Sequence, residues 1–200
     1  MGKTRLRFLL LIWLAFSATL CLSDHYFHVR TRTLRYHWAP MVDGQSVWVG
    51  LVFGAAAVAM IAGTLAFPLS DVPPRIPWRS ILGSYTVFVA AYAISGQVGA
   101  THPTALFVTL AILWLLRVAL RQHDRLVYLV HGLVLALLGV VGEGLFSIAG
   151  LFDYRLQQVV DCPWWLAGLY LHGSIALLEV ARGAKSLHAP AVGQATVRAV

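Results

Sequence analysis

The amino-acid sequence predicts an all-α fold: a polytopic membrane protein built as a bundle of six transmembrane helices. Of its 200 residues, 59% are hydrophobic and 12% are charged, whereas soluble domains usually carry about 25% charged residues. Lipid is therefore the expected surroundings of most of the chain, and the length suffices for one domain. We expect residues 1–182 to form that domain and residues 183–200 to be a short, disordered cytoplasmic tail.

Six apolar runs account for the six helices. A helix needs roughly 20 apolar residues to cross the hydrocarbon core. The runs that reach or approach this length are Phe8–Leu22, Ser46–Leu69, Ile81–Val98, Thr104–Leu120, Leu126–Leu151 and Pro163–Ala181. The first run follows Lys3, Arg5 and Arg7, as the apolar part of a signal peptide does. Because five more runs follow closely, we expect an uncleaved anchor instead.

The basic residues indicate how the chain sits in the membrane. The net charge is +7, but the arginines gather at the ends of the apolar runs, which is typical of membrane flanks and argues against nucleic-acid binding. With the amino terminus inside, 11 of the 15 basic residues fall on the cytoplasmic side. Both termini are therefore expected in the cytoplasm. The excess of arginine over lysine favours a GC-rich bacterial genome, hence a bacterial plasma membrane; in a eukaryote the endoplasmic reticulum would fit.

Glu143 is the most informative polar residue inside an apolar run. It lies in the outer half of the fifth run between Gly142 and Gly144, with Ser147 one helical turn later on the same face. An unpaired carboxylate in hydrocarbon costs several kcal/mol, so it should be protonated, paired or wetted. The two glycines would let another helix or a lipid chain approach closely.

Other polar residues are expected at a depth comparable with Glu143. They are Gln97, Ser95 and His172. Three interpretations stay open for this group: hydrogen bonds between helices, a wet or lipid-headgroup cavity, and an acid–base pair of Glu143 and His172. Glu179, near the inner end of the sixth run, precedes Arg182 by three residues and is expected to form a local ion pair with it.

The remaining candidate ligands for a metal are weak. His25 and His28 lie three residues apart in the segment after the first run, but no third ligand follows at a suitable spacing. Cys21 and Cys162 are expected to be unpaired thiols. We therefore predict no metal and no cofactor.

Seven short motifs resemble the insulin-induced (Insig) protein family in order and spacing, over roughly residues 45–183. The motifs are Phe67-Pro68-Leu69-Ser70-Asp71, Trp78-Arg79-Ser80, Val87-Phe88-Val89, Thr109-Leu110-Ala111, Asp124-Arg125, Gly150-Leu151-Phe152-Asp153-Tyr154 and Cys162-Pro163-Trp164-Trp165. The resemblance implies a six-span protein without enzymatic activity. Animal members hold oxysterols and retain a sterol-sensing escort protein and a sterol-synthesis reductase in the endoplasmic reticulum. Bacterial relatives look like lipid binders with a central cavity suited to a diacylglycerol-like molecule.

The residues and the resemblance together predict a non-catalytic protein that holds a diacylglycerol- or sterol-like membrane lipid between its helices. Apolar contact gains little over bulk lipid, so selectivity would come from a few polar groups. The candidate lining residues are Phe88, Tyr92, Gln97, Ala105, Thr109, Val140, Glu143, Ser147 and His172. Ala105 replaces a glutamine of the family, which weakens the expectation of oxysterol recognition. A homo-oligomer is left open, and no protein partner is identified.

Two other functions compete with lipid binding. The first is a small intramembrane enzyme that acts on a lipid or isoprenoid with Glu143 and His172 as acid and base. The second is a transporter, which the sequence disfavours because no pair of broken helices recurs in two matching halves.

Overall fold

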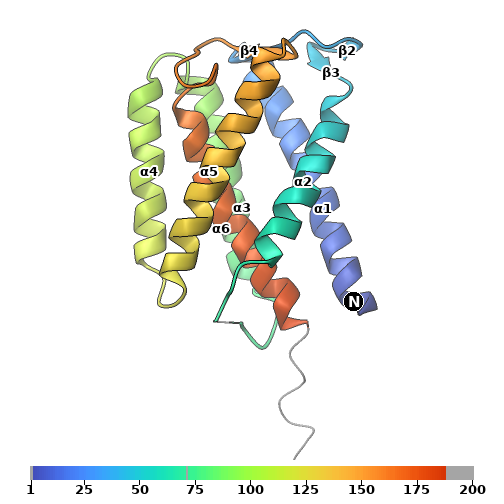
Figure 1. Ribbon diagram of the computed structural model, residues 1–200, viewed down its shortest axis with the longest axis vertical. Helices are drawn as coiled ribbons and strands as arrows, with labels where there is room; N and C mark the ends of the chain where they lie inside the picture. Colours follow the sequence, from blue (N-terminus) through green and yellow to red (C-terminus); the bar gives the residue numbers. More distant parts are fainter. Residues whose placement is uncertain (1, 71, 188–200) are drawn as a thin grey trace, which may run out of the picture.

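The computed structural model describes residues 2–70 and 72–187, which form a bundle of six α-helices capped at one end by short strands (Figure 1). The helices are α1 Lys3–Ser23, α2 Val49–Leu65, α3 Trp78–Val98, α4 Pro103–Ala119, α5 Arg125–Ile148 and α6 Trp165–Ser186. Pro103 opens α4 at the first helical position, where its missing N–H costs nothing. The predicted bundle of six helices is confirmed.

α6 is the central helix of the bundle. It contacts all five other α-helices, and 18 of its 22 residues are buried. Its glycines permit close packing: a Cβ at Gly168 would meet Leu110 of α4, and a Cβ at Gly173 would meet Phe88 of α3. The central position also shields the polar residues of α6 from lipid, since His172 and Glu179 are both fully buried.

The six helices are not equivalent membrane spans. The helical segment Lys3–Val29, α3 and α5 are long and apolar enough to cross a membrane, whereas α2 and α4 are apolar but only 17 residues long. A helix of that length covers about 25 Å, slightly less than a typical hydrocarbon core. The sequence predicted six similar spans because hydropathy does not distinguish a lipid-facing helix from one enclosed by the others.

A cap of irregular and extended segments closes one end of the bundle. α1 passes directly into the π-helix η1, Asp24–Val29, a wider helical turn that is frequent at functional sites. β1, Leu34–Tyr36, pairs antiparallel with β4, Phe152–Tyr154, and β2, Met41–Val42, pairs with β3, Gln45–Ser46. The cap lies at the end opposite the amino terminus (Figure 1).

Residues 183–186, which were expected to belong to the tail, are helical. α6 continues through residues 183–186 because a face of small residues lets Gly183 and Ala184 pack inside the bundle. A Cβ at Gly183 would already touch Phe8, Ile76 and Ile81. The rest of the predicted tail, residues 188–200, lies outside the described part of the chain.

Candidate functional site

A cavity of about 390 Å³ lies between α1, α2, α3, α5 and α6, and the cap closes one end of it, which we call the outer end. Most of its wall is apolar. Leu138 and Phe146 of α5 line the cavity and are nevertheless 63% and 41% exposed. The cavity is therefore open along α5, on a face that would meet membrane lipid.

Glu143 lies at the wall of this cavity, held by two tyrosines from other elements. The Tyr170 hydroxyl of α6 donates to Oε1 at 2.5 Å, and the Tyr154 hydroxyl of β4 donates to Oε2. Burial and the charge of Glu143 raise the pKa of Tyr154 well above its ordinary value, so this phenol stays a donor. Two of the predicted roles coincide at this residue, since Glu143 both connects helices and lines a cavity.

A second carboxylate, Asp24, lines the same cavity from the π-helix η1 and is only 2% exposed. Its Oδ2 accepts hydrogen bonds from the Tyr36 hydroxyl at 2.8 Å and the Gln45 amide at 2.9 Å, and its Oδ1 lies 3.7 Å from Nδ1 of His28. Burial and the charge of Asp24 raise the pKa of Tyr36 well above its ordinary value, so Tyr36 also stays a donor. Sequence reasoning missed Asp24; the available signal was an acid four residues before a histidine, directly after an apolar run.

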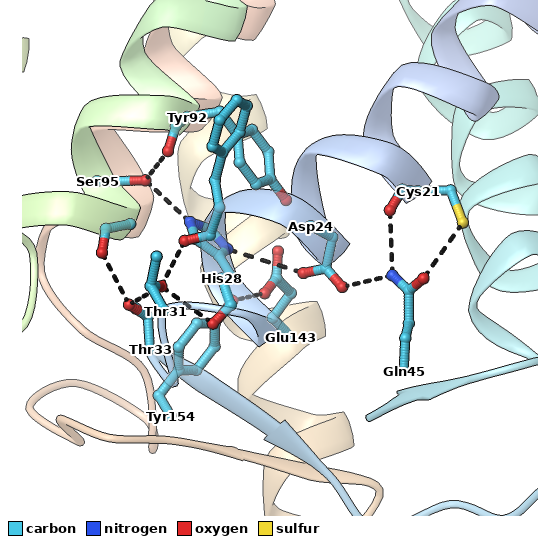
Figure 2. A network of polar contacts seen from close by, with 12 residues as sticks. Cys21, Asp24, His28, Thr31, Thr33, Gln45, Tyr92, Ser95, Glu143 and Tyr154 are labelled. Carbon is cyan, nitrogen blue, oxygen red and sulfur yellow. Dashed lines mark hydrogen bonds and ion pairs between the residues drawn. The ribbon is translucent and has the colours of Figure 1, made fainter. Parts of the chain in front are cut away.

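The polar network continues from Asp24 through His28 to Ser95 of α3 (Figure 2). Nε2 of His28 lies 2.9 Å from Ser95 Oγ, and Ser95 donates to the carbonyl of Tyr92 at 2.8 Å. The order Ser–His–Asp resembles a hydrolase triad. However, Ser95 and His28 are 0% exposed and neither belongs to the cavity wall. The network therefore fastens η1 to α3 and offers no accessible nucleophile.

At the inner end of the cavity, His131 of α5 meets Thr64 of α2. His131 Nε2 lies 2.9 Å from the Thr64 hydroxyl, which itself donates to the carbonyl of Met60 at 2.6 Å. Because the single hydroxyl proton is used in that bond, Thr64 accepts from Nε2–H. This bond links α2 to α5 at the inner end of the cavity.

The structure brings together three of the nine predicted lining residues. Phe88, Tyr92 and Glu143 all line the cavity. The predicted set is otherwise dispersed: Gln97, Ala105 and Thr109 are exposed, Val140 is half-buried and Ser147 is buried, and none of these five lines the cavity. They were grouped by depth or by motif, and depth along a helix does not specify which way a side chain points around it.

His172 also lies apart from the cavity, at the interface of α6 with α4. Its Nε2 is 3.0 Å from the carbonyl of Leu110, and its Nδ1 is 2.9 Å from a guanidinium nitrogen of Arg117. A carbonyl only accepts and a guanidinium only donates, so both ring nitrogens are engaged. The predicted pairing of Glu143 with His172 is therefore wrong in geometry.

Glu179 anchors the inner part of the bundle. Its Oε1 accepts hydrogen bonds from Arg121, in the turn after α4, and from Tyr128 of α5, each at 2.5 Å, and Oε2 lies 3.2 Å from Arg182. The predicted Glu179–Arg182 pair is confirmed, and it belongs to a larger network that joins α5, α6 and the turn after α4.

The two histidines of the outer segment have different partners. His25 lies 3.2 Å from the exposed carboxylate of Asp43, whereas His28 turns inward to Ser95. Cys21 and Cys162 are both free thiols.

The sequence matches no protein-family model and no curated protein. The structure, by contrast, is similar to the crystal structure of MvINS, a mycobacterial Insig homologue from Mycobacterium vanbaalenii, with a TM-score of 0.77 and 20% sequence identity over 90% of this chain and 95% of that chain. A crystal structure of a cross-linked MvINS trimer matches to the same extent. This protein has the Insig-homologue fold. The resemblance predicted from the motifs is confirmed at the level of the fold, and the chain is an integral membrane protein.

Several motifs of this Insig-like chain meet in the structure. Asp124 of the Asp124-Arg125 motif accepts hydrogen bonds from the Ser70 backbone at 3.1 Å and the Ser70 hydroxyl at 2.5 Å, which ties the turn before α5 to the segment after α2. Phe67 of the second-span motif lines the cavity. Tyr154, which ends the fifth-span motif, donates to Glu143.

Proposed function

We propose that this protein is a non-catalytic membrane lipid-binding protein that holds a diacylglycerol- or sterol-like lipid in the cavity between its helices. The cavity itself is the observation that carries the proposal. Its volume of about 390 Å³ falls in the range of small-molecule sites, which is about 300–1,000 Å³. An apolar chamber with a few convergent polar groups is typical of such sites.

The lipid would enter laterally from the membrane, between α2 and α5. Both helices line the cavity, yet α2 packs mainly on α1 and α6, and α5 packs mainly on α6. Ala59 of α2 and Leu138 of α5 are exposed and line the cavity. A chain passing between these small and flexible side chains would not have to cross water.

The apolar body of the lipid would lie against Phe16 and Phe88, and its polar end would lie near Tyr92, Asp24 and Glu143. Because membrane lipid is as apolar as the cavity wall, burial of the chains gains little free energy. Discrimination would therefore come from the outer polar end. Of the polar residues predicted from the sequence, Glu143 remains in the proposed lipid site. Asp24 takes the place in that site that the sequence analysis gave to His172.

We propose a bacterial plasma membrane as the location, with both termini in the cytoplasm. α1 begins and α6 ends at the same end of the bundle (Figure 1), and this end carries Arg121, Arg125 and Lys185. An excess of basic residues on one side is the usual mark of the cytoplasmic face. By analogy with the cross-linked MvINS trimer, we also propose a homotrimer, which light scattering of the detergent-solubilised protein would test.

The test of lipid binding is a mass spectrum of the molecules that the detergent-purified protein retains, compared with the bulk membrane extract. Gly142 lines the cavity with open space around its Cβ position, so Gly142→Leu would fill part of the cavity. Gly83 of α3 is exposed, also has open space and does not line the cavity, so Gly83→Leu is the matched control.

We expect one lipid class to be enriched at least about tenfold over the membrane extract in the native protein and in Gly83→Leu, and to be lost in Gly142→Leu, since the leucine would occupy cavity volume next to Glu143. Retained lipid that mirrors the bulk membrane in all three proteins would refute the proposal.

A further inference from the structure

The outer end of the cavity holds two carboxylates that lack a fixed cationic partner. Asp24 and Glu143 both line it, and they are close enough for their charges to interact. Figure 2 shows their carboxylates on neighbouring sides of the same network. Their close hydrogen-bond donors are uncharged, since three are tyrosine hydroxyls and one is an amide.

Among the residues that the structure describes, no arginine or lysine lies within ion-pair distance of either carboxylate. The nearest titratable base is His28, whose Nδ1 lies 3.7 Å from Asp24 and has no hydrogen-bond partner. When both carboxylates are ionised, a protonated His28 compensates only one of the two negative charges at this end of the cavity. A buried charge without a counter-charge is unfavourable, so a positive ligand group would be stabilised here.

A polar side chain without a partner also faces this site. Tyr92 of α3 is only 7% exposed and lines the cavity. Its ring stacks on His28 at 4.5 Å between centroids, but its hydroxyl has no hydrogen-bond partner among the described residues. Asp24 and Glu143 line the same cavity. A buried hydroxyl left unpaired in a cavity wall is suited to bind a polar group of a ligand.

Aromatic rings complete the surroundings of the carboxylates. The rings that the cap and α3 contribute to the cavity wall at this end belong to Tyr36, Trp38, Tyr92 and Phe152. Aromatic faces attract ammonium groups, and rings combined with carboxylates form the cages that bind amines. The same carboxylates repel phosphate, so the site disfavours ordinary anionic phospholipids.

From the two carboxylates, the unpaired Tyr92 hydroxyl and the aromatic rings at this end, we infer that the cavity selects lipids whose polar end is a cationic amine without a phosphate. The inference rests on the proposed binding of a lipid in this cavity, and it replaces the hydroxyl end of a diacylglycerol or sterol by an amine. The ammonium group lies between Asp24 and Glu143, with Tyr92 accepting one N–H, and the hydrocarbon chain runs along the apolar wall toward the inner end. A plain hydroxyl would satisfy Tyr92 but leave the negative charge uncompensated.

The experiment compares three probes with the same chain: oleylamine, oleyl alcohol and oleyl phosphate. Each is added at equal mole fraction to the purified full-length protein in a neutral maltoside detergent at pH 7, where the amine is charged, and bound probe is counted by native mass spectrometry. We expect the amine to bind at least about tenfold more tightly than the alcohol, and the phosphate to bind most weakly.

The variants assign any preference to the two carboxylates. Asp24→Asn combined with Glu143→Gln should bring amine and alcohol to within about twofold of each other, while Asp43→Asn, the same change at an exposed carboxylate outside the cavity, should keep the preference. If the double variant does not fold, as judged by thermal unfolding, Glu143→Gln alone keeps one acceptor for a tyrosine hydroxyl and should reduce the preference at least about threefold.

The outcomes separate the two proposals. Equal binding of amine and alcohol to the native protein, tighter binding of the phosphate, or a preference that survives in the carboxylate variants would overturn the inference and leave lipid binding intact. Failure of every probe to saturate the protein would overturn the proposed function as well.

Discussion

The Tyr170 hydroxyl of α6 donates a 2.5 Å hydrogen bond to Oε1 of Glu143 on α5, at the wall of the cavity. Tyr154 of β4 donates to the other carboxylate oxygen. One ionisable residue thus connects the central helix, a lipid-facing helix and the cap. These two hydrogen bonds hold the Glu143 carboxylate in place at the polar end of the cavity.

Removing either tyrosine hydroxyl should weaken the bundle. Tyr170→Phe and Tyr154→Phe each leave a half-buried carboxylate short of one donor, so each should lower the free energy of unfolding by about 1–3 kcal/mol. Thermal unfolding in detergent measures the change. Tyr26→Phe is the matched control because Tyr26 is 51% exposed, and its melting temperature should not move. Equal stability of all three variants would show that the two hydrogen bonds contribute nothing.

Glu179→Ala should be among the most destabilising single substitutions in the bundle. It removes the fully buried partner of Arg121 and Arg182, which are themselves mostly buried. Breaking such a pair from one side costs about 3–5 kcal/mol because buried charge is left unpaired. Chemical unfolding in mild detergent tests this, with Asp43→Asn as the control: loss of its exposed pair with Arg30 should change stability much less than Glu179→Ala does, because surface ion pairs contribute little. A Glu179→Ala protein as stable as the control would contradict the assignment.

Gly96 should tolerate no side chain. A Cβ at this position would overlap the carbonyl of Phe27 in η1, so Gly96→Ala must push the π-helix off α3 and should cost about 3 kcal/mol or more. Gly83→Ala, in the same helix but facing open space, should instead stabilise the protein by about 1 kcal/mol. Melting temperatures that shift in the same direction for both would show that η1 does not pack on α3 as described.

Cys162 should be inert in the folded protein. It is 0% exposed, and burial raises the pKa of its thiol from 9.0 to about 12, so the reactive thiolate is scarce at pH 8. In a Cys21→Ser background, alkylation by N-ethylmaleimide at pH 8 should be at least about a hundredfold slower in the folded than in the unfolded state. Rapid labelling of the folded protein would disprove the burial.

The same pKa shift sets a limit on stability at high pH. The folded state favours the neutral thiol, so the contribution of Cys162 is fully present below the unfolded pKa of about 9 and falls as the pH rises toward 12. Cys162→Ser lacks this titration, and its melting temperature should fall less steeply between these pH values than that of the native protein.

Hydropathy alone determined the class of this protein, the number of its helices and the approximate limits of most of them, because a helix in lipid must be apolar over a fixed length. The same reasoning singled out Glu143, since an ionisable residue in an apolar run requires a partner. Phe88 and Tyr92 came from the family resemblance and from the apolar pattern of α3, and both line the cavity.

Only the tertiary structure decided which polar residues share a site. Asp24 and Tyr36 reach the cavity because a π-helix and the pairing of Leu34 with Tyr154 fold the outer segment over the bundle, and such long-range pairings leave no periodic signal in the sequence. His172 and Gln97 have depths similar to that of Glu143 but point elsewhere, because the rotation of each helix about its axis is set by packing against its neighbours. The position of a residue within an apolar run indicates how deep it lies in the membrane. The contacts between helices determine the direction in which its side chain points.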